Sequence, residues 1–191
     1  MDIWEDLLTV NKYSRPGKKL AEVLGFVIHW VANPMSTPKQ NRDYFELRKN
    51  GEHGYGSAHF IVGIDGDIIQ CIPENEVAYH CGTSRPISPN STQIYTDMAR
   101  TVFGKYCQSP TSNSPNNCTI GIEMCHPDWS GEFTNDTLEA TSEVLRHLIN
   151  KYNKKDILTH NEVVGWKDCP RWFVEHPSEL SQYLNHVMDG C

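Results

Sequence analysis

The 191-residue sequence has no run of basic residues, no apolar segment near 18 residues and no low-complexity tract. Nucleic-acid-binding proteins usually carry a basic face, whereas the net charge here is −7 with histidine neutral, so we expect no nucleic-acid partner. Without a long apolar run, no membrane-spanning helix and no membrane insertion are expected. Hydrophobic residues make up 38% of the sequence, which argues against disorder.

The first ten residues, MDIWEDLLTV, lack the basic region and apolar stretch of a secretory signal. We therefore expect a protein that is made in the cytosol or exported with the help of another protein. Seven cysteines are present, which is an odd number. In a reducing compartment they predict free thiols and a metal ligand rather than a disulfide framework.

Short apolar segments between turn residues predict an α/β fold, with a mixed central sheet flanked by helices in a single domain. The predicted strands cover residues 25–30, 59–63, 68–72, 118–125 and 156–159. The predicted helices cover residues 38–48, 92–106, 137–152 and 178–188. Asp65-Gly66 between two apolar segments is typical of a β-hairpin, and Thr134 is a suitable N-cap for the long third helix.

Three residues have the chemistry of zinc ligands. His29 lies near the end of the first predicted strand, His160 follows a short strand, and Cys169 comes nine residues later, directly before Pro170. Three protein ligands of this kind leave a fourth position open, as in catalytic zinc sites. The sequence also holds nine histidines, and a lone histidine at a strand end is usually structural, so the residues alone leave both interpretations open.

Glu123 and Lys167 also have two interpretations each. Glu123 could point to solvent from an edge strand, but in a strand buried on both faces a carboxylate is costly unless it has a partner or a function. Lys167 could be a solvated loop residue. Beside a metal, Glu123 could take a proton from an attacking water and return it to a leaving amine, while Lys167 could stabilise an oxyanion.

Seven short segments occur in an order typical of one family. They are FVIHW at 26–30, SAHFIV at 57–62, DG at 65–66, AYHCG at 78–82, TIGIE at 119–123, THNE at 159–162 and KDCPRWF at 167–173. In this order they resemble the type 2 N-acetylmuramoyl-L-alanine amidases, which include phage endolysins, Bacillus autolysins and peptidoglycan recognition proteins. The resemblance covers roughly residues 24–188.

The resemblance implies that residues 1–191 form a single zinc amidase catalytic domain. Such a domain hydrolyses the amide bond between N-acetylmuramic acid and L-alanine in bacterial peptidoglycan. The resemblance implies one Zn²⁺ per chain, bound by His29, His160 and Cys169. It also implies that Glu123 and Lys167 are the catalytic pair.

One position departs from this resemblance. Some relatives carry a catalytic tyrosine directly before the His-Phe pair, where this sequence has Ala58. A mechanism that depends on that tyrosine is therefore excluded, and Glu123 must carry more of the proton transfer.

The surroundings of the site are expected to include five further residues. His59 and His80 could be structural, or could support the ligands or contact substrate. Trp30, Trp166 and Arg171 are expected to line the groove, because aromatic faces suit sugar rings and arginine suits the carboxylates of the stem peptide.

Two other functions fit parts of the sequence. A non-catalytic peptidoglycan-recognition module could share the fold, but such modules typically lose the cysteine ligand, and Cys169 is present. A metal-free hydrolase could use Cys169 with His160. Pro170 is unfavourable there, because a cysteine nucleophile usually begins a helix whose amides lower its pKa.

The expected synthesis in the cytosol matches phage endolysins, which reach the cell wall after holin-mediated release. We therefore expect an endolysin or autolysin catalytic domain. Many endolysins carry a separate cell-wall-binding domain, and this sequence stops just after the last expected helix. We expect either a catalytic domain taken from a longer protein or a naturally short enzyme.

Overall fold

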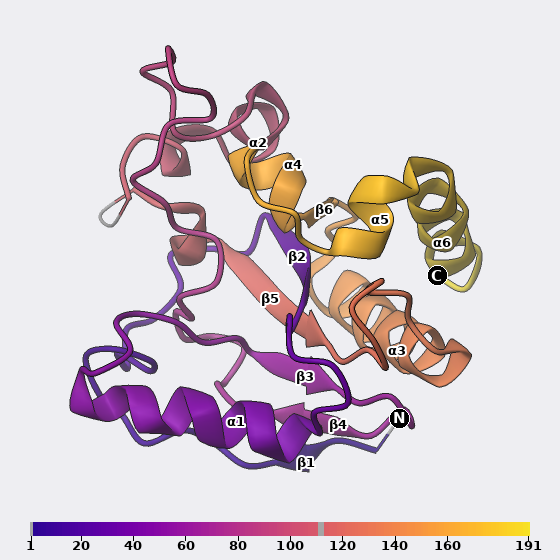
Figure 1. The fold of residues 1–191 in the computed structure, drawn as a ribbon. Coiled ribbons are helices and arrows are strands. Elements are labelled where there is room, and N and C mark those ends of the chain that lie inside the picture. The colour runs from indigo at the N-terminus through magenta and orange to yellow at the C-terminus, as the bar shows by residue number, and fades with distance from the viewer. Residues whose placement is uncertain (1, 111–112) are drawn as a thin grey trace.

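A six-stranded mixed sheet runs through the part of the chain that this computed structural model describes, residues 2–110 and 113–191 (Figure 1). Its strands in spatial order are β1 (Trp4–Glu5), β4 (Ile68–Gln70), β3 (Phe60–Val62), β5 (Thr119–Met124), β2 (Gly25–Trp30) and β6 (Ile157–Thr159). β3 and β4 are antiparallel, whereas the other neighbouring pairs are parallel. The predicted mixed sheet is confirmed.

The hairpin forms where Asp65-Gly66 predicts it. Phe60 lies opposite Gln70 across the antiparallel pair, and Gly66 in the connecting turn has a φ of +80°, which favours glycine. β5 pairs with β3 on one side and with β2 on the other, so it is an interior strand. The interpretation of Glu123 as an edge-strand residue is therefore wrong.

The α-helices of the described residues are α1 (Pro38–Leu47), α2 (Asp97–Phe103), α3 (Asn135–Tyr152), α4 (His160–Val164), α5 (Arg171–Glu175) and α6 (Pro177–Asp189). Thr37 caps α1 and Thr134 caps α3, because each side chain accepts a hydrogen bond from the backbone N–H three residues later. None of these helices combines the length and the apolar character needed to cross a membrane.

Four elements differ from the prediction. The helix predicted over residues 92–106 begins only at Asp97, after the N-cap Thr96, and gives way to a 3₁₀ turn at Gly104–Tyr106. α4 and α5 have five residues each, which is too short for the periodicity that identifies longer helices. β1 is a two-residue edge strand with exposed side chains, so its sequence carries no alternation of buried and exposed positions.

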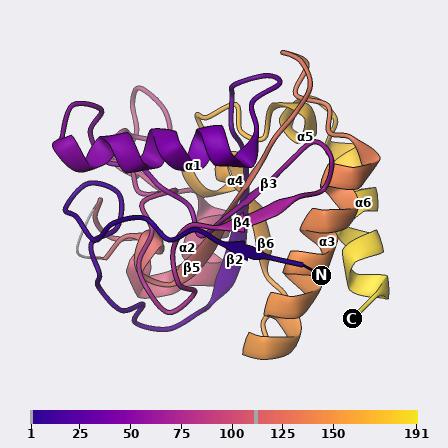
Figure 2. The same ribbon diagram turned by 90° about the horizontal axis from the view of Figure 1, so that it is seen from below.

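One face of the sheet is apolar and packs against α3 and α6. Phe26 and Ile28 of β2 and Ile120 and Ile122 of β5 are fully buried there, in a cluster that includes Leu145 of α3. Figure 2 shows α3 and α6 together on this side, with α1 on the other. This layer is the main hydrophobic core.

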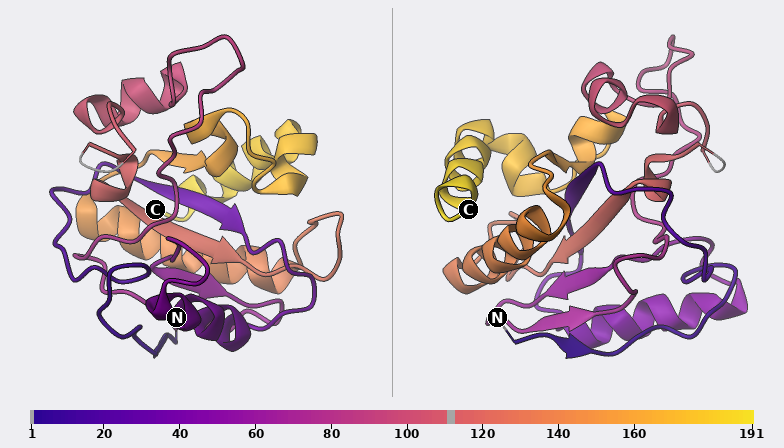
Figure 3. Two further views of the ribbon diagram at one scale, coloured as in Figure 1. Left: turned by 60° about the vertical axis from the view of Figure 1, so that its left-hand side comes forward. Right: turned by 180° about the vertical axis from the view of Figure 1, so that it is seen from behind.

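The opposite face carries two separate apolar clusters. One joins Val27 to Phe103 of α2 and Val163 of α4, and the other joins Ile61 of β3 to Phe45 of α1. In Figures 1 and 3, α1 and the α2–α4 pair lie apart, with β2 and β5 between them. The middle of this face therefore lies between two packed regions.

Polar residues occupy that middle region. Successive side chains of a strand point to opposite faces, so His29 faces away from Ile28, and Glu123 faces away from Ile122. His29 and Glu123 also lie opposite each other in the register of β2 and β5. The fold thus brings an imidazole and a carboxylate together on one buried surface.

Candidate active site

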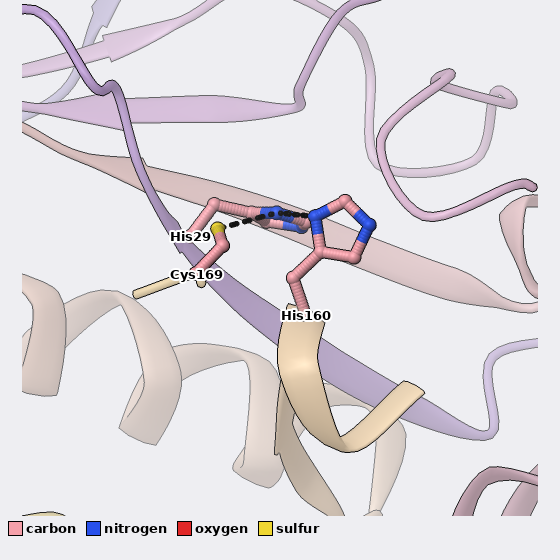
Figure 4. A group of neighbouring side chains, drawn as sticks. All are labelled: His29, His160 and Cys169. Carbon is pink, nitrogen blue, oxygen red and sulfur yellow. Dashed lines mark hydrogen bonds between the residues drawn. The ribbon is translucent and has the colours of Figure 1, made fainter. Parts of the chain in front are cut away.

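Three potential metal ligands meet near the end of β2. The Nδ1 atom of His29 lies 3.0 Å from Nδ1 of His160 and 3.7 Å from Sγ of Cys169. One potential ligand atom from each residue lies within 4.8 Å of the other two, and all three residues are buried. Figure 4 shows the three side chains converging on one point.

Local structure fixes the second and third ligands. β6 pairs with β2, and it leads directly into α4, whose first residue is His160. Thr159 forms a capping box with Glu162, which sets the direction of this strand-to-helix turn. The backbone N–H of Asn161 donates to the carbonyl of Cys169 at 2.8 Å, and this hydrogen bond ties the cysteine to the start of α4.

The donor set fits a zinc ion. Typical bond lengths of 2.0–2.1 Å to nitrogen and 2.3 Å to sulfur place tetrahedral ligand atoms roughly 3.3–3.6 Å apart. The two distances from His29 Nδ1, 3.0 Å and 3.7 Å, are close to this range. Burial lowers the pKa of His29 well below its ordinary value and that of His160 to about 3, so both rings are neutral and have lone pairs to donate. Burial raises the pKa of the Cys169 thiol above its usual range, so a cation beside it would be needed to hold the thiolate.

Glu123 lies beside this cluster with an unsatisfied oxygen. Among the described residues its buried Oε2 atom has no hydrogen-bond partner. Desolvation raises the pKa of Glu123 to about 8, although the positive charges of Lys167 and Arg48 oppose the shift. A buried carboxylate of this kind is costly unless a ligand or a reaction uses it.

The site opens into a large cleft with a volume of about 1220 Å³. Basic residues predominate among the charged side chains that line it, which are Lys12, Lys18, Arg48, Arg85 and Lys167 against Glu123 and Asp168. The cleft is thus cationic although the whole chain carries a charge of −7. Its volume exceeds the usual range of small-molecule pockets, about 300–1,000 Å³.

Comparison with known proteins identifies the family. The N-acetylmuramoyl-L-alanine amidase family matches residues 19–172, a range that includes the three potential ligands, Glu123 and Lys167. The chain belongs to this family. The family resemblance predicted from the sequence segments is therefore confirmed.

Relatives of this chain include the N-acetylmuramoyl-L-alanine amidases BlyA of Bacillus subtilis (strain 168) and CwlL of Bacillus licheniformis. BlyA is 33% identical over 183 residues, which are 94% of this chain and 45% of BlyA. CwlL is 30% identical over 190 residues, which are 96% of this chain and 46% of CwlL. The chain thus spans about half the length of these relatives.

Two solved structures share the fold. The structure of PlyL superimposes with a TM-score of 0.69 at 20% identity, covering 98% of this chain and 97% of that chain. The solution structure of the PlyG catalytic domain gives a TM-score of 0.69 at 20% identity, covering 100% of this chain and 95% of that chain. The predicted single-domain amidase fold is confirmed.

The five residues expected around the site occupy different positions in the structure. Trp30, Trp166 and His80 line the cleft. His59 is fully buried behind it, where its Nδ1 atom accepts from the backbone N–H of Gly121 and its Nε2 atom donates to the carbonyl of Glu76, both at 2.9 Å.

Arg171 lies at the first turn of α5, outside the cleft lining. Its guanidinium donates to Glu175 at 3.0 Å and lies 3.7 Å from Asp168. These two carboxylates already compensate its charge.

The sequence interpretation missed the other cations of the cleft. Lys12 and Lys18 lie between β1 and β2, Arg48 begins the 3₁₀ helix that follows α1, and Arg85 lies in the segment before α2, so no local motif connects all four. The guanidinium of Arg85 lies 4.4 Å from the ring centroid of Trp166, within the range of a cation–π interaction. An arginine near an aromatic residue in space leaves no signal when the two are 81 positions apart in the sequence.

Proposed function

We propose that the protein is a zinc-dependent hydrolase of bacterial peptidoglycan that cleaves the amide bond between N-acetylmuramic acid and L-alanine. The observation that carries this proposal is the buried trio of His29, His160 and Cys169 with Glu123 beside it in an open cleft. Membership of the amidase family supports the same reaction. A bound zinc ion would polarise the scissile carbonyl and lower the pKa of an attacking water towards about 7.

Glu123 is the proposed general base and then general acid. With a pKa raised to about 8 by desolvation, its carboxylate can take a proton from water and later return it to the leaving amine near neutral pH. Its unpaired Oε2 atom lies on the same face as His29, so it can be reached by a water beside the ligands.

Lys167 is the proposed stabiliser of the oxyanion. It lines the same cleft, and its positive charge lowers the pKa of Glu123, which means that the two groups interact across the site. An ammonium group at this position would favour the negative charge that develops on the carbonyl oxygen.

The charge of the cleft suits the stem peptide, which carries carboxylates. Arg48 and Arg85 lie on the cleft lining together with Trp30 and Trp166, so the walls offer cations for carboxylates and aromatic faces for sugar rings. The volume of about 1220 Å³ leaves room for a piece of polymer rather than a single small molecule.

A metal-free cysteine hydrolase fits less well. A nucleophilic thiol needs a lowered pKa, whereas burial raises the pKa of Cys169. A non-catalytic recognition module would not need Glu123 to be buried without a partner. Both alternatives remain distinguishable from the amidase by experiment.

The biological setting forms part of the same proposal. We propose a lytic role as an endolysin or autolysin catalytic domain, made in the cytosol and acting on the cell wall, in an endolysin after holin-mediated release. The test is expression in a bacterial host with and without a holin: lysis only with the holin supports this setting, and lysis without it contradicts holin dependence.

Purified sacculi provide the test of the reaction. The zinc-loaded enzyme should release free L-alanine amino groups without new reducing sugar ends, and a chelator should abolish the release. Metal analysis should find about one zinc per chain, and Cys169→Ser should lower it sharply because a hydroxyl is a poorer ligand than a thiolate. New reducing ends would identify a glycosidase, and activity that survives chelation would favour the thiol hydrolase.

A further inference from the structure

We propose that His80 and Thr119 fix the tautomer of His29, so that the lone pair on His29 Nδ1 faces the ligand cluster before any metal binds. This inference rests on the proposed zinc site, but it concerns hydrogen bonds that the protein forms by itself. His80 and Thr119 are positioning residues in this proposal, because they act through His29.

The series of hydrogen bonds begins at the hydroxyl of Thr119. Its Oγ1 atom donates to the carbonyl of Pro115 at 2.8 Å, and a carbonyl can only accept. A hydroxyl has one hydrogen, so the same Oγ1 atom must accept from the other polar neighbour, Nε2 of His80, at 3.1 Å. The thiol of Cys81, 3.6 Å away, donates to Asn116 Oδ1, so it leaves this arrangement unchanged.

The ring of His80 connects Thr119 to His29. Its Nε2 atom carries the hydrogen that Thr119 accepts, and in a neutral, buried imidazole the other nitrogen is then an acceptor. That acceptor, Nδ1, lies 3.0 Å from Nε2 of His29. The hydrogen of this bond must therefore come from His29.

The ring of His29 donates the last hydrogen bond of the series. With its hydrogen on Nε2, the neutral ring has a lone pair on Nδ1. Nδ1 is the atom that lies 3.0 Å from His160 Nδ1 and 3.7 Å from Cys169 Sγ. The carbonyl of Pro115, which is at least 45 positions from any potential ligand in the sequence, thus determines which nitrogen of His29 can bind a metal.

The surroundings hold His80 in the position that this arrangement needs. Its backbone N–H donates to Asn116 Oδ1 at 3.1 Å. A Cβ atom at Gly121 would lie only 2.5 Å from Cγ of His80, so the ring rests directly on the backbone of β5. Every second residue of that strand points to the same face, and on this face lie Thr119, Gly121 and Glu123. They provide, in that order, the hydrogen-bond acceptor, the space for the ring and the carboxylate.

The tautomer can be measured without any variant. In zinc-free wild-type protein with ¹⁵N-labelled histidine, long-range ¹H–¹⁵N correlation spectra should show His29 with hydrogen on Nε2 and none on Nδ1. His80 should show the same tautomer. A hydrogen on Nδ1 of His29, or a mixture of the two tautomers, would overturn the proposal.

Variants test whether the arrangement affects metal binding. Thr119→Val keeps the shape but removes the acceptor, so zinc affinity should fall about 10–100-fold, the usual effect of losing a group that orients a ligand. Thr119→Ser restores the hydroxyl and should recover most of the affinity. Unchanged zinc affinity and an unchanged His29 spectrum in Thr119→Val would contradict the proposal.

Thr137 offers a matched control. It is a buried threonine on α3 that donates to the carbonyl of Gly63 at 2.9 Å, so Thr137→Val also loses one hydrogen bond to a backbone carbonyl. This variant should lose stability without losing zinc affinity. An equal loss of zinc affinity in both variants would mean that general destabilisation, rather than the His29 tautomer, causes the effect.

The two proposals fail in different ways. If wild-type protein binds no zinc but His29 has its hydrogen on Nε2, the zinc site is wrong and the tautomer arrangement stands. If zinc binds but His29 has its hydrogen on Nδ1 in the zinc-free protein, the arrangement is wrong and the amidase proposal stands.

Discussion

The two faces of β5 and β2 consist of neighbouring residues with opposite properties. On the face toward α3, Ile28 and Ile122 are fully buried among apolar side chains. On the other face, His29 is buried and polar, and Glu123 is partly buried, with a buried Oε2 atom that has no hydrogen-bond partner among the described residues. One strand pair thus stabilises the fold with one face and holds a costly reactive surface with the other.

The sharpest way to test this contrast is Glu123→Ala. Loss of the general base should lower activity on sacculi by about 10²–10⁴-fold, while zinc content stays near wild type. The pKa of Glu123 is raised by burial to about 8, so its ionised form opposes folding as pH rises from 4.5 towards 8. Thermal stability at neutral pH, measured on zinc-free protein, should therefore be unchanged or higher.

Near wild-type hydrolysis by Glu123→Ala would mean that the general base lies elsewhere. His80, which lines the cleft, would then be the next candidate to test, whereas His59 is fully buried with both ring nitrogens hydrogen-bonded. A loss of zinc along with activity would instead indicate that Glu123 helps to hold the metal.

The neighbouring substitution Ile122→Ala should have the opposite effect. It removes a fully buried side chain from the main core, so the free energy of unfolding should fall by about 2–5 kcal/mol in urea denaturation. Zinc content per folded chain should stay near one, because the residue faces away from the ligands. If Ile122→Ala left stability unchanged and Glu123→Ala destabilised the protein strongly, the contrast between the two faces would be wrong.

Lys167→Ala tests the charge on the rim of the polar face. Activity should fall by about 10²–10³-fold with zinc retained, since an oxyanion would lose one stabilising group. The double variant with Glu123→Ala should lose less than the product of the two losses, because both groups act on one transition state. Steady-state rates on sacculi measure this, and Lys151→Ala, on the distant helix α3, is a suitable control.

The smallest expected effect is the contribution of His59 to the pH dependence of the free energy of unfolding. Burial lowers its pKa from 6.5 to about 4, so between these values the unfolded chain binds a proton that the folded chain does not. The free energy of unfolding should therefore fall as pH is lowered through this window, by up to about 3 kcal/mol from this residue.

His59→Gln keeps a donor and an acceptor but cannot titrate, so it should lose less stability than wild type between pH 7 and pH 4. Urea denaturation of both zinc-free proteins at the two pH values measures the difference. Equal acid sensitivity in the two proteins would show that His59 does not contribute to it.

Much of the fold could be predicted because several segments carry a strong local pattern. The apolar segment around Val27, the Asp65-Gly66 turn and the N-cap Thr134 each predict an element that is present. α4 could not be predicted in this way, because its five residues owe their helical form to the capping box at Thr159 and to packing of Val163 and Val164.

The site was predictable only in part. Sequence order and family resemblance indicated His29, His160 and Cys169, which lie together, but they did not indicate how the cleft is charged. Arg48 reaches it from the 3₁₀ helix after α1 and Arg85 from the segment before α2, and such convergence depends on the folded chain. The importance of Thr119 was also hidden, because a threonine in an apolar strand is typical of many strands.

The alternation of side chains between the two faces of β5 limits which mutations this gene can tolerate. Thr119, Gly121 and Glu123 share one face, and Ile120 and Ile122 share the other. Deletion or duplication of a single codon within this segment would exchange the two sets, turning the isoleucines to the cleft and the carboxylate into the core. Point substitutions can adjust the segment, but we expect insertions and deletions to be tolerated only in the loops on either side.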